Sequence, residues 1–122
     1  MSQNIETVNR YLDGFRKNHH GQILSCLTDD ITWTVFGAFR LTGKEAYDRA
    51  IDGAPEFIDP PELEVVRIVE QGDVVMAELT GRARRAAGGE MRMSMAEVFV
   101  MRDSRIAERR AWVIVLEEND YR

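Results

Sequence analysis

The sequence predicts a single domain of the α+β class, with three helices ahead of a mainly antiparallel sheet. Helical spacing of apolar residues is found in the first part of the chain, within residues 4–52. After Pro60 and Pro61, four long stretches alternate like strands, separated by compact turns. Helices followed by an antiparallel meander are typical of the α+β class. Because 122 residues suit one domain of ordinary core size, we assign residues 1–122 to it.

Three segments carry the helical pattern. The first spans residues 4–17, where apolar side chains recur at Ile5, Val8, Leu12 and Phe15, with Tyr11 beside them. A short second helix is predicted at residues 22–27. The third covers residues 44–52 and presents Ala46, Tyr47, Ala50 and Ile51 on one face, with Thr42 as a candidate N-cap.

The remaining segments read as strands. Residues 31–36 alternate and are rich in β-formers, and residues 37–43 form a loop or a short hairpin. The four long strands are predicted at residues 62–71, 74–85, 90–102 and 105–116. Their apolar faces need a partner layer, so the helices are expected to cover one face of the sheet. The last strand is not purely polar on either face, which predicts a second subunit against the outer face.

One acidic side chain, Glu97, interrupts a strand face that is otherwise apolar. Every second residue of that strand gives the set Met91, Met93, Met95, Glu97, Phe99 and Met101. A buried carboxylate must be paired, protonated or hydrogen-bonded. Two interpretations remain open: Glu97 is a pocket-floor acid that bonds a ligand oxygen, or it forms an ion pair with Arg109 of the last strand. An apolar site favours the protonated acid, whereas a close Arg109 favours the carboxylate.

Composition narrows the classes of partner. The net charge is -5, so no nucleic acid partner is expected. No apolar stretch reaches the roughly 20 residues of a membrane span, and the first residues lack the pattern of a secretory signal. We therefore expect a cytoplasmic protein without a membrane partner, in which the single cysteine, Cys26, forms no internal disulfide.

Metal and cofactor chemistry has no support in the sequence. The two histidines, His19 and His20, fall between the first two helices, where a solvated turn is predicted. No set of His, Cys and carboxylate residues has ligand spacing. A phosphate-binding glycine loop and a nucleophilic-serine motif are also missing, so no metal and no cofactor is expected.

Several local motifs resemble the SnoaL-like group of the nuclear transport factor 2-like superfamily, over nearly the whole sequence. These motifs are residues 10–15, 23–33, 41–46 and 98–106. The resemblance implies a cone-shaped, curved antiparallel or mixed sheet wrapped around three N-terminal helices, with a pocket at its wide end. It also implies a homodimer. Members of this superfamily include isomerases, cyclases, epoxide hydrolases, dehydratases and non-enzymatic binders, so the fold does not name a function.

Ketosteroid isomerases offer the nearest chemical comparison. Their oxyanion hole pairs a first-helix tyrosine with a protonated acid, and the resemblance places Tyr11 and Glu97 at these two positions. Their general-base aspartate falls on Val35, so the isomerase activity does not carry over as it stands. The residues that activate water in the superfamily's epoxide hydrolases fall on Leu79, Gly81 and Ala111, none of which can do so, and that activity is not expected.

These observations predict a protein that binds a small, largely apolar ligand through a carbonyl or phenol-like oxygen. Tyr11 and Glu97 are the candidate catalytic residues, stabilising an enolate in an isomerase- or cyclase-type reaction. The candidate ligand-binding residues are Trp33, Val35, Leu79, Met93, Met95, Arg109, Ala111 and Val113. Whether the protein is an enzyme stays open. The alternatives are a non-catalytic ligand-binding or dimerisation module, and a polyketide-type cyclase or dehydratase.

Overall fold

A computed structural model describes residues 2–52 and 61–117 of the chain. The boundary residue Pro60 lies outside these ranges, as do the ends of the assigned domain. The helices are α1 (Gln3–Lys17), α2 (His20–Ser25) and α3 (Lys44–Ile51). The strands are β1 (Leu27–Val35), β2 (Phe39–Thr42), β3 (Glu62–Gln71), β4 (Val74–Arg84), β5 (Glu90–Arg102) and β6 (Arg105–Leu116).

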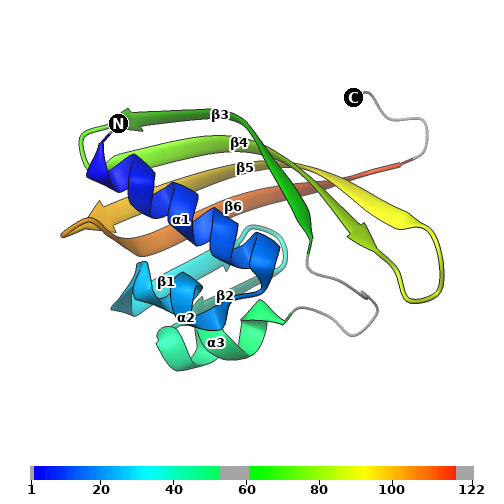
Figure 1. Cartoon of the computed structure of the whole chain (residues 1–122), viewed down its shortest axis with the longest axis horizontal. Helices are drawn as coiled ribbons and strands as arrows, with labels where there is room; N and C mark the ends of the chain where they lie inside the picture. Colours follow the sequence, from blue (N-terminus) through cyan, green and yellow to red (C-terminus); the bar gives the residue numbers. More distant parts are fainter. Residues whose placement is uncertain (1, 53–60, 118–122) are drawn as a thin grey trace.

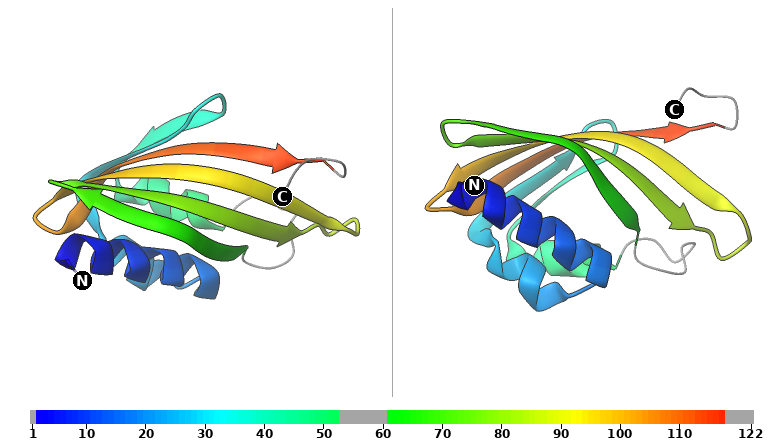
Figure 2. Two further views of the ribbon diagram at one scale, coloured as in Figure 1. Left: turned by 90° about the horizontal axis from the view of Figure 1, so that it is seen from above. Right: turned by 45° about the horizontal axis from the view of Figure 1, so that its top comes forward.

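The six strands form one mixed sheet in the order β2-β1-β6-β5-β4-β3. Strands β1 and β6 run parallel, and the other neighbours run antiparallel. The sheet curves strongly without closing into a barrel, and the three helices lie on its concave side (Figures 1 and 2). This arrangement confirms the predicted α+β class with helices covering one face.

The first helix follows ordinary capping rules at both ends, whereas the third does not. In α1 the Ser2 side chain accepts a hydrogen bond from the backbone N–H of Ile5, and Asn18 ends the helix in the left-handed conformation. The prediction that Thr42 caps α3 is wrong. Gly43 holds that position without a side-chain bond, at a φ of 93° that favours glycine.

The first strand begins earlier than its sequence pattern predicts. Residues 22–27 read as helical, yet α2 ends at Ser25 and β1 begins at Leu27. Leu27 pairs in parallel with Ile106 of β6, and the register shifts before Thr32. Pairing with a distant strand has therefore decided the conformation of residues 27–30. The predicted loop or short hairpin at residues 37–43 is a hairpin that contains β2.

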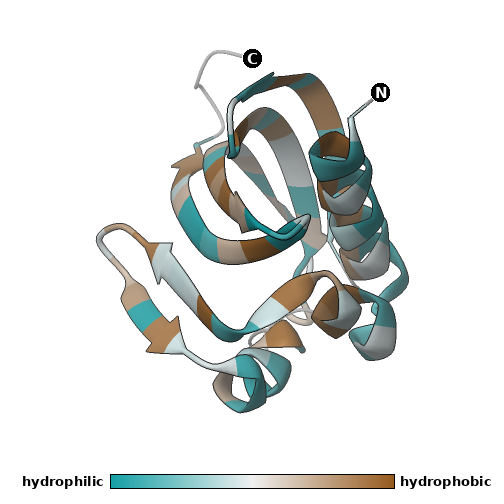
Figure 3. Ribbon diagram, turned by 90° about the vertical axis from the view of Figure 1, so that its left-hand side faces the viewer, coloured by the Kyte–Doolittle hydropathy of each residue, from teal (hydrophilic) through white to brown (hydrophobic). Residues whose placement is uncertain are grey.

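The core lies between the helices and the concave face of the sheet. Hydropathic bands alternate along the strands because successive side chains point to opposite faces (Figure 3). In β4, for example, buried and exposed residues alternate without a break from Val75 to Arg84. No helix among the described residues is long and apolar enough to cross a membrane.

The sequence predicts a solvated turn for His20, but the structure places this residue in a helix. It is the first residue of α2, and His19 caps that helix by accepting the N–H of Gln22. The Nδ1 atom of His20 lies 2.5 Å from an oxygen of Asp48, and the Nε2 atom of His20 lies 2.8 Å from an oxygen of Asp52. Two carboxylate partners require N–H groups on both ring nitrogens, which only the imidazolium has. His20 can therefore donate to both carboxylates, and so link α2 to the end of α3, only in its charged form.

This link predicts a stability that falls with rising pH. Hydrogen bonds from Asp48 and Asp52 raise the pKa of His20 above its ordinary 6.5. Because the folded-state pKa is the higher one, the contribution is complete below about pH 6.5 and is lost as the pH rises through the folded-state value. The melting temperature of the wild type should therefore fall more than that of His20→Asn between about pH 5.5 and pH 8.5. Parallel melting curves for both proteins would contradict the charged link.

Candidate functional site

A buried ion pair lies on the concave face where β5 and β6 meet. Glu97 pairs in register with Ala111, and Arg109 with Phe99, so Glu97 and Arg109 are diagonal neighbours. Arg109 Nε donates to Glu97 Oε1 at 2.7 Å, and Arg109 Nη2 donates to Glu97 Oε2 at 2.9 Å. The side chain of Arg109 is 11% exposed and that of Glu97 is 1% exposed. The structure therefore shows the ion pair that the sequence left as one of two interpretations.

Two tyrosines complete the polar cluster on the helix side. Arg109 Nη1 donates to the hydroxyl oxygen of Tyr11 at 2.6 Å and to that of Tyr47 at 3.2 Å. The two hydroxyl groups are also hydrogen-bonded to each other. Tyr11 comes from α1 and Tyr47 from α3, and both are fully buried. One guanidinium thus ties two helices to the sheet.

Trp33 adds an aromatic wall with an unused donor. It lies beside Arg109 in the parallel β1–β6 pairing, and the guanidinium carbon sits 4.3 Å from the centre of the indole ring. Its ring stacks on that of Tyr47 with centroids 4.8 Å apart. Trp33 is 9% exposed, and its buried Nε1–H has no hydrogen-bond acceptor among the described residues. Burying a hydrogen-bond donor without an acceptor is unfavourable, and this makes Trp33 a candidate site residue.

The electrostatics keep the tyrosines protonated and the arginine charged. Burial raises the pKa of Tyr11 well above its ordinary value, and burial likewise raises the pKa of Tyr47. Burial by itself lowers the pKa of Arg109, but attraction to Glu97 and to the tyrosine oxygens outweighs it and leaves this pKa well above normal. With both oxygens occupied by Arg109, Glu97 acts as an acceptor that holds the guanidinium in place. The hydroxyl groups, rather than Glu97, are the available donors.

The other candidate ligand-binding residues form an apolar surface on the same concave face. It contains Val35 of β1, Leu79 of β4, Met93 and Met95 of β5, and Ala111 and Val113 of β6. Leu79 and Ala111 are fully buried, whereas Val113 is partly exposed. The structure thus places every candidate residue on the concave side and gathers Tyr11, Trp33, Glu97 and Arg109 into direct contact.

Methionine side chains occupy the space that small residues leave in β4. A Cβ atom added to Gly81 would lie 2.8 Å from the Cε of Met95 and 3.1 Å from that of Met93. The space beside Gly81 is therefore filled by the methyl groups of these two methionines. Because methionine is flexible, these methyl groups form a wall that can rearrange.

Sequence reasoning missed Tyr47 as a site residue. The helical pattern placed it on the buried face of the third helix, where it was counted as apolar. A tyrosine hydroxyl on such a face needs a polar partner, and this is the signal that could have found it.

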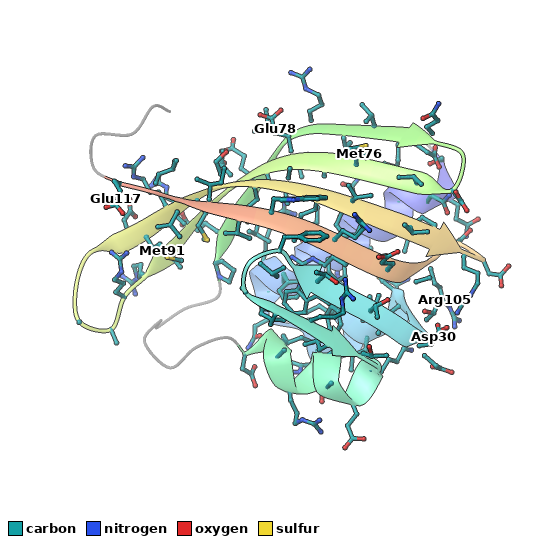
Figure 4. The ribbon with its side chains drawn as sticks, turned by 180° about the vertical axis from the view of Figure 1, so that it is seen from behind. Asp30, Met76, Glu78, Met91, Arg105 and Glu117 are labelled. Atoms are coloured by element: carbon teal, nitrogen blue, oxygen red, sulfur yellow. The ribbon has the colours of Figure 1, made fainter. Side chains whose placement is uncertain are left out.

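A second polar group lies at the end of the sheet near the β5–β6 turn, away from the Glu97–Arg109 pair. A hollow of about 410 Å³ is lined there by Thr28, Asp29, Asp30, Arg102, Asp103 and Arg105. Figure 4 shows Asp30 and Arg105 at this end, opposite the end with Met91 and Glu117. Asp30 accepts hydrogen bonds from Arg102 and Thr28, so its charge is already paired. Within residues 2–52 and 61–117, no group of three or more His, Cys, Asp or Glu side chains is placed to hold a metal ion.

Comparison with known proteins assigns the fold and a family. The SnoaL-like domain family matches residues 8–109. An epoxide hydrolase of Mycobacterium tuberculosis, described as LEH-like, is 20% identical with a TM-score of 0.81, covering 92% of this chain and 83% of the other. An NTF2-like protein of unknown function from Burkholderia pseudomallei K96243 is 19% identical with a TM-score of 0.83, covering 91% and 90%.

A third similar structure contains a bound molecule. TerC, co-crystallised with polyporic acid, is 23% identical with a TM-score of 0.80, covering 94% of this chain and 92% of the other. No curated protein sequence is significantly similar to this chain. At these identities the structural likeness establishes the fold alone.

Proposed function

Because this chain belongs to the SnoaL-like family, we propose that it binds a small, largely apolar molecule through a carbonyl or phenol-like oxygen. One observation carries the proposal: Arg109 holds two buried, protonated tyrosine hydroxyls together beside an apolar surface. Sites of this kind bind the apolar body of a ligand by burial and orient it through a few polar groups. No metal and no cofactor forms part of the proposal.

The roles of the two candidate catalytic residues differ under this proposal. Tyr11, together with Tyr47, donates hydrogen bonds to the ligand oxygen. Glu97 acts through Arg109, which it holds in position with two hydrogen bonds. Such a donor group stabilises an oxygen that gains negative charge, which supports an isomerase- or cyclase-type reaction through an enolate.

An epoxide hydrolase activity has less support, although one similar structure is described as such an enzyme. The three positions compared above are occupied by Leu79, Gly81 and Ala111, which are apolar and lie on the concave face. None of these side chains can activate water. Non-catalytic ligand binding by the same site remains the alternative function, because Val35 provides no base to accept a proton from the ligand.

Titration with substituted naphthols of graded acidity tests the proposal. We expect saturable quenching of tryptophan fluorescence, with affinity that varies with phenol acidity. Tyr11→Phe and Tyr47→Phe should each weaken binding about tenfold, because each removes one hydroxyl from the donor group. Thr7→Val is the matched control, since it removes a hydroxyl from the same helix as Tyr11 but one that bonds the carbonyl of Ser104. No binding at millimolar naphthol would contradict the proposal.

We further propose that the protein forms a homodimer through the outer face of the sheet. Large apolar side chains on that face are exposed, including Trp112 at 39% and Ile114 at 62%. Phe36 and Trp112 stack with centroids 4.8 Å apart, and the Arg110 guanidinium lies over both rings. The outer face of the sheet is toward the viewer in Figure 4, with Met76 and Glu78 of β4 labelled. An apolar face of this kind supports an interface between identical subunits.

The cellular setting is also a proposal. We place the protein in the cytoplasm without nucleic acid as a partner, on the ground of its acidic charge of -5 and its lone, buried cysteine.

A further inference from the structure

We infer that the site selects a carbonyl oxygen over an aliphatic hydroxyl or an amino group, and that Trp33 Nε1–H is a specificity-determining donor. This inference rests on the proposed ligand-binding function and narrows its ligand class. It follows from a count of the protons and acceptors in the cluster that contains Tyr11, Tyr47, Trp33, Glu97 and Arg109.

The tyrosine pair has one hydroxyl proton more than its described acceptors use. Arg109 Nη1 donates to both hydroxyl oxygens, so these bonds use lone pairs and no tyrosine proton. The bond between Tyr11 and Tyr47 uses the proton of one hydroxyl, whichever of the two donates. The other hydroxyl therefore keeps a proton for which the described residues show no acceptor. Because burial raises the pKa of both tyrosines, this proton stays in place at neutral pH.

Trp33 supplies a second unpaired donor in the same cluster. The indole N–H can only donate, it is buried, and it has no acceptor among the described residues. The ring is fixed by stacking on Tyr47 and by the guanidinium of Arg109 at 4.3 Å. Holding a donor unpaired in a buried place is unfavourable until an acceptor arrives.

Two unpaired donors and a neutralised ion pair define the complementary group. A carbonyl oxygen has two lone pairs and no proton, so it can accept a hydrogen bond from either donor without bringing a proton that itself needs an acceptor. An aliphatic alcohol of the same shape brings a proton that needs a further acceptor, and it releases that proton far less readily than a naphthol does. An ammonium group adds positive charge beside Arg109, and a carboxylate adds net charge to a cluster whose Glu97–Arg109 pair is already balanced. A neutral ketone or quinone-type carbonyl fits best.

Three ligands of nearly equal shape test this inference: 1-indanone, 1-indanol and indane. We expect 1-indanone to bind the wild-type protein about tenfold more tightly than either of the others. Trp33→Phe keeps an aromatic ring against Tyr47 and Arg109 but removes the N–H. In this variant the preference for 1-indanone over indane, taken as the ratio of their affinities for the same protein, should fall to about threefold.

The outcomes separate the inference from the function on which it rests. Equal binding of all three compounds would retain an apolar ligand site and overturn the selection of carbonyls. Tightest binding of 1-indanol would also overturn it. No binding of any compound, together with no binding of naphthols, would overturn the proposed function and the inference with it.

Nuclear magnetic resonance provides a readout that does not depend on the stability of a variant. The protein has two tryptophans, Trp33 and Trp112, and therefore two indole N–H signals. Adding 1-indanone to the wild type should move the Trp33 signal downfield, as a new hydrogen bond does, whereas indane should not. Trp112 lies on the opposite face of the sheet and serves as the internal reference. A Trp33 signal that moves equally with both compounds would contradict a donor role.

Discussion

Replacing Glu97 by leucine is expected to lower the free energy of unfolding by about 3–5 kcal/mol. The substitution leaves the Arg109 guanidinium among buried aromatic rings without its anionic partner. The loss exceeds that of an ordinary core substitution because an uncompensated buried charge remains. Urea unfolding followed by circular dichroism measures it. The substitution should also abolish ligand binding, because Arg109 loses the carboxylate that holds it beside the tyrosine hydroxyls.

The double variant Glu97→Leu/Arg109→Met is the matched control. It removes both charges and keeps similar volumes, so we expect it to recover most of the stability lost in Glu97→Leu. Ligand binding should not recover, because the tyrosine hydroxyls lose the arginine that holds them. A Glu97→Leu protein as stable as the wild type would contradict a desolvated ion pair at this position. Naphthol binding by the folded double variant would show that the Glu97–Arg109 pair is not part of the binding site.

Replacing Ile114 by aspartate is expected to convert the proposed homodimer into monomers. Ile114 lies on the outer face of β6 and, within residues 2–52 and 61–117, is the most exposed of the large hydrophobic residues. In an interface between identical subunits the substitution buries a carboxylate from each chain, which should weaken association by roughly 100-fold or more. Analytical ultracentrifugation over a concentration series measures this change.

The adjacent residue provides the control for assembly. Val115 is also exposed, but it pairs with Met93 on the concave face. Val115→Asp introduces the same charge one position along the strand, on the opposite side of the sheet. We expect it to leave the oligomeric state unchanged. Monomeric wild-type protein at all concentrations, or dissociation by both substitutions alike, would contradict an interface on the outer face.

The α+β class could be reached from the sequence because it depends on local periodicity and turn residues, and the family was implied by the resemblance of several local motifs. The four long strands were found within about one residue of their ends. Alternation also placed Glu97 on the buried face of β5 and Arg109 on that of β6. Strand side chains alternate between the two faces of the sheet, so once one face is apolar the alternation fixes which residues point to the core.

Contacts between distant elements escaped sequence reasoning for a physical reason. Leu27 joins a strand because it pairs with Ile106, and His20 gains two carboxylate partners because α3 and its C-cap bring Asp48 and Asp52 to it. Local patterns carry no information on such pairings. The expectation that Thr42 caps α3 was also wrong, because the residue at the N-cap position of α3 is Gly43.

The same distinction applies to the candidate site. The sequence by itself determined that a carboxylate lies on an apolar strand face and must be compensated, because an isolated buried charge is prohibitively unfavourable. Only the tertiary structure decided how. It brings Arg109 into a two-bond pairing with Glu97, adds Tyr47 from a helix 36 residues beyond Tyr11, and leaves the Trp33 N–H without an acceptor. Hydrogen-bond partners depend on distances of tenths of an ångström between elements, and these are set by packing rather than by the order of residues along the chain.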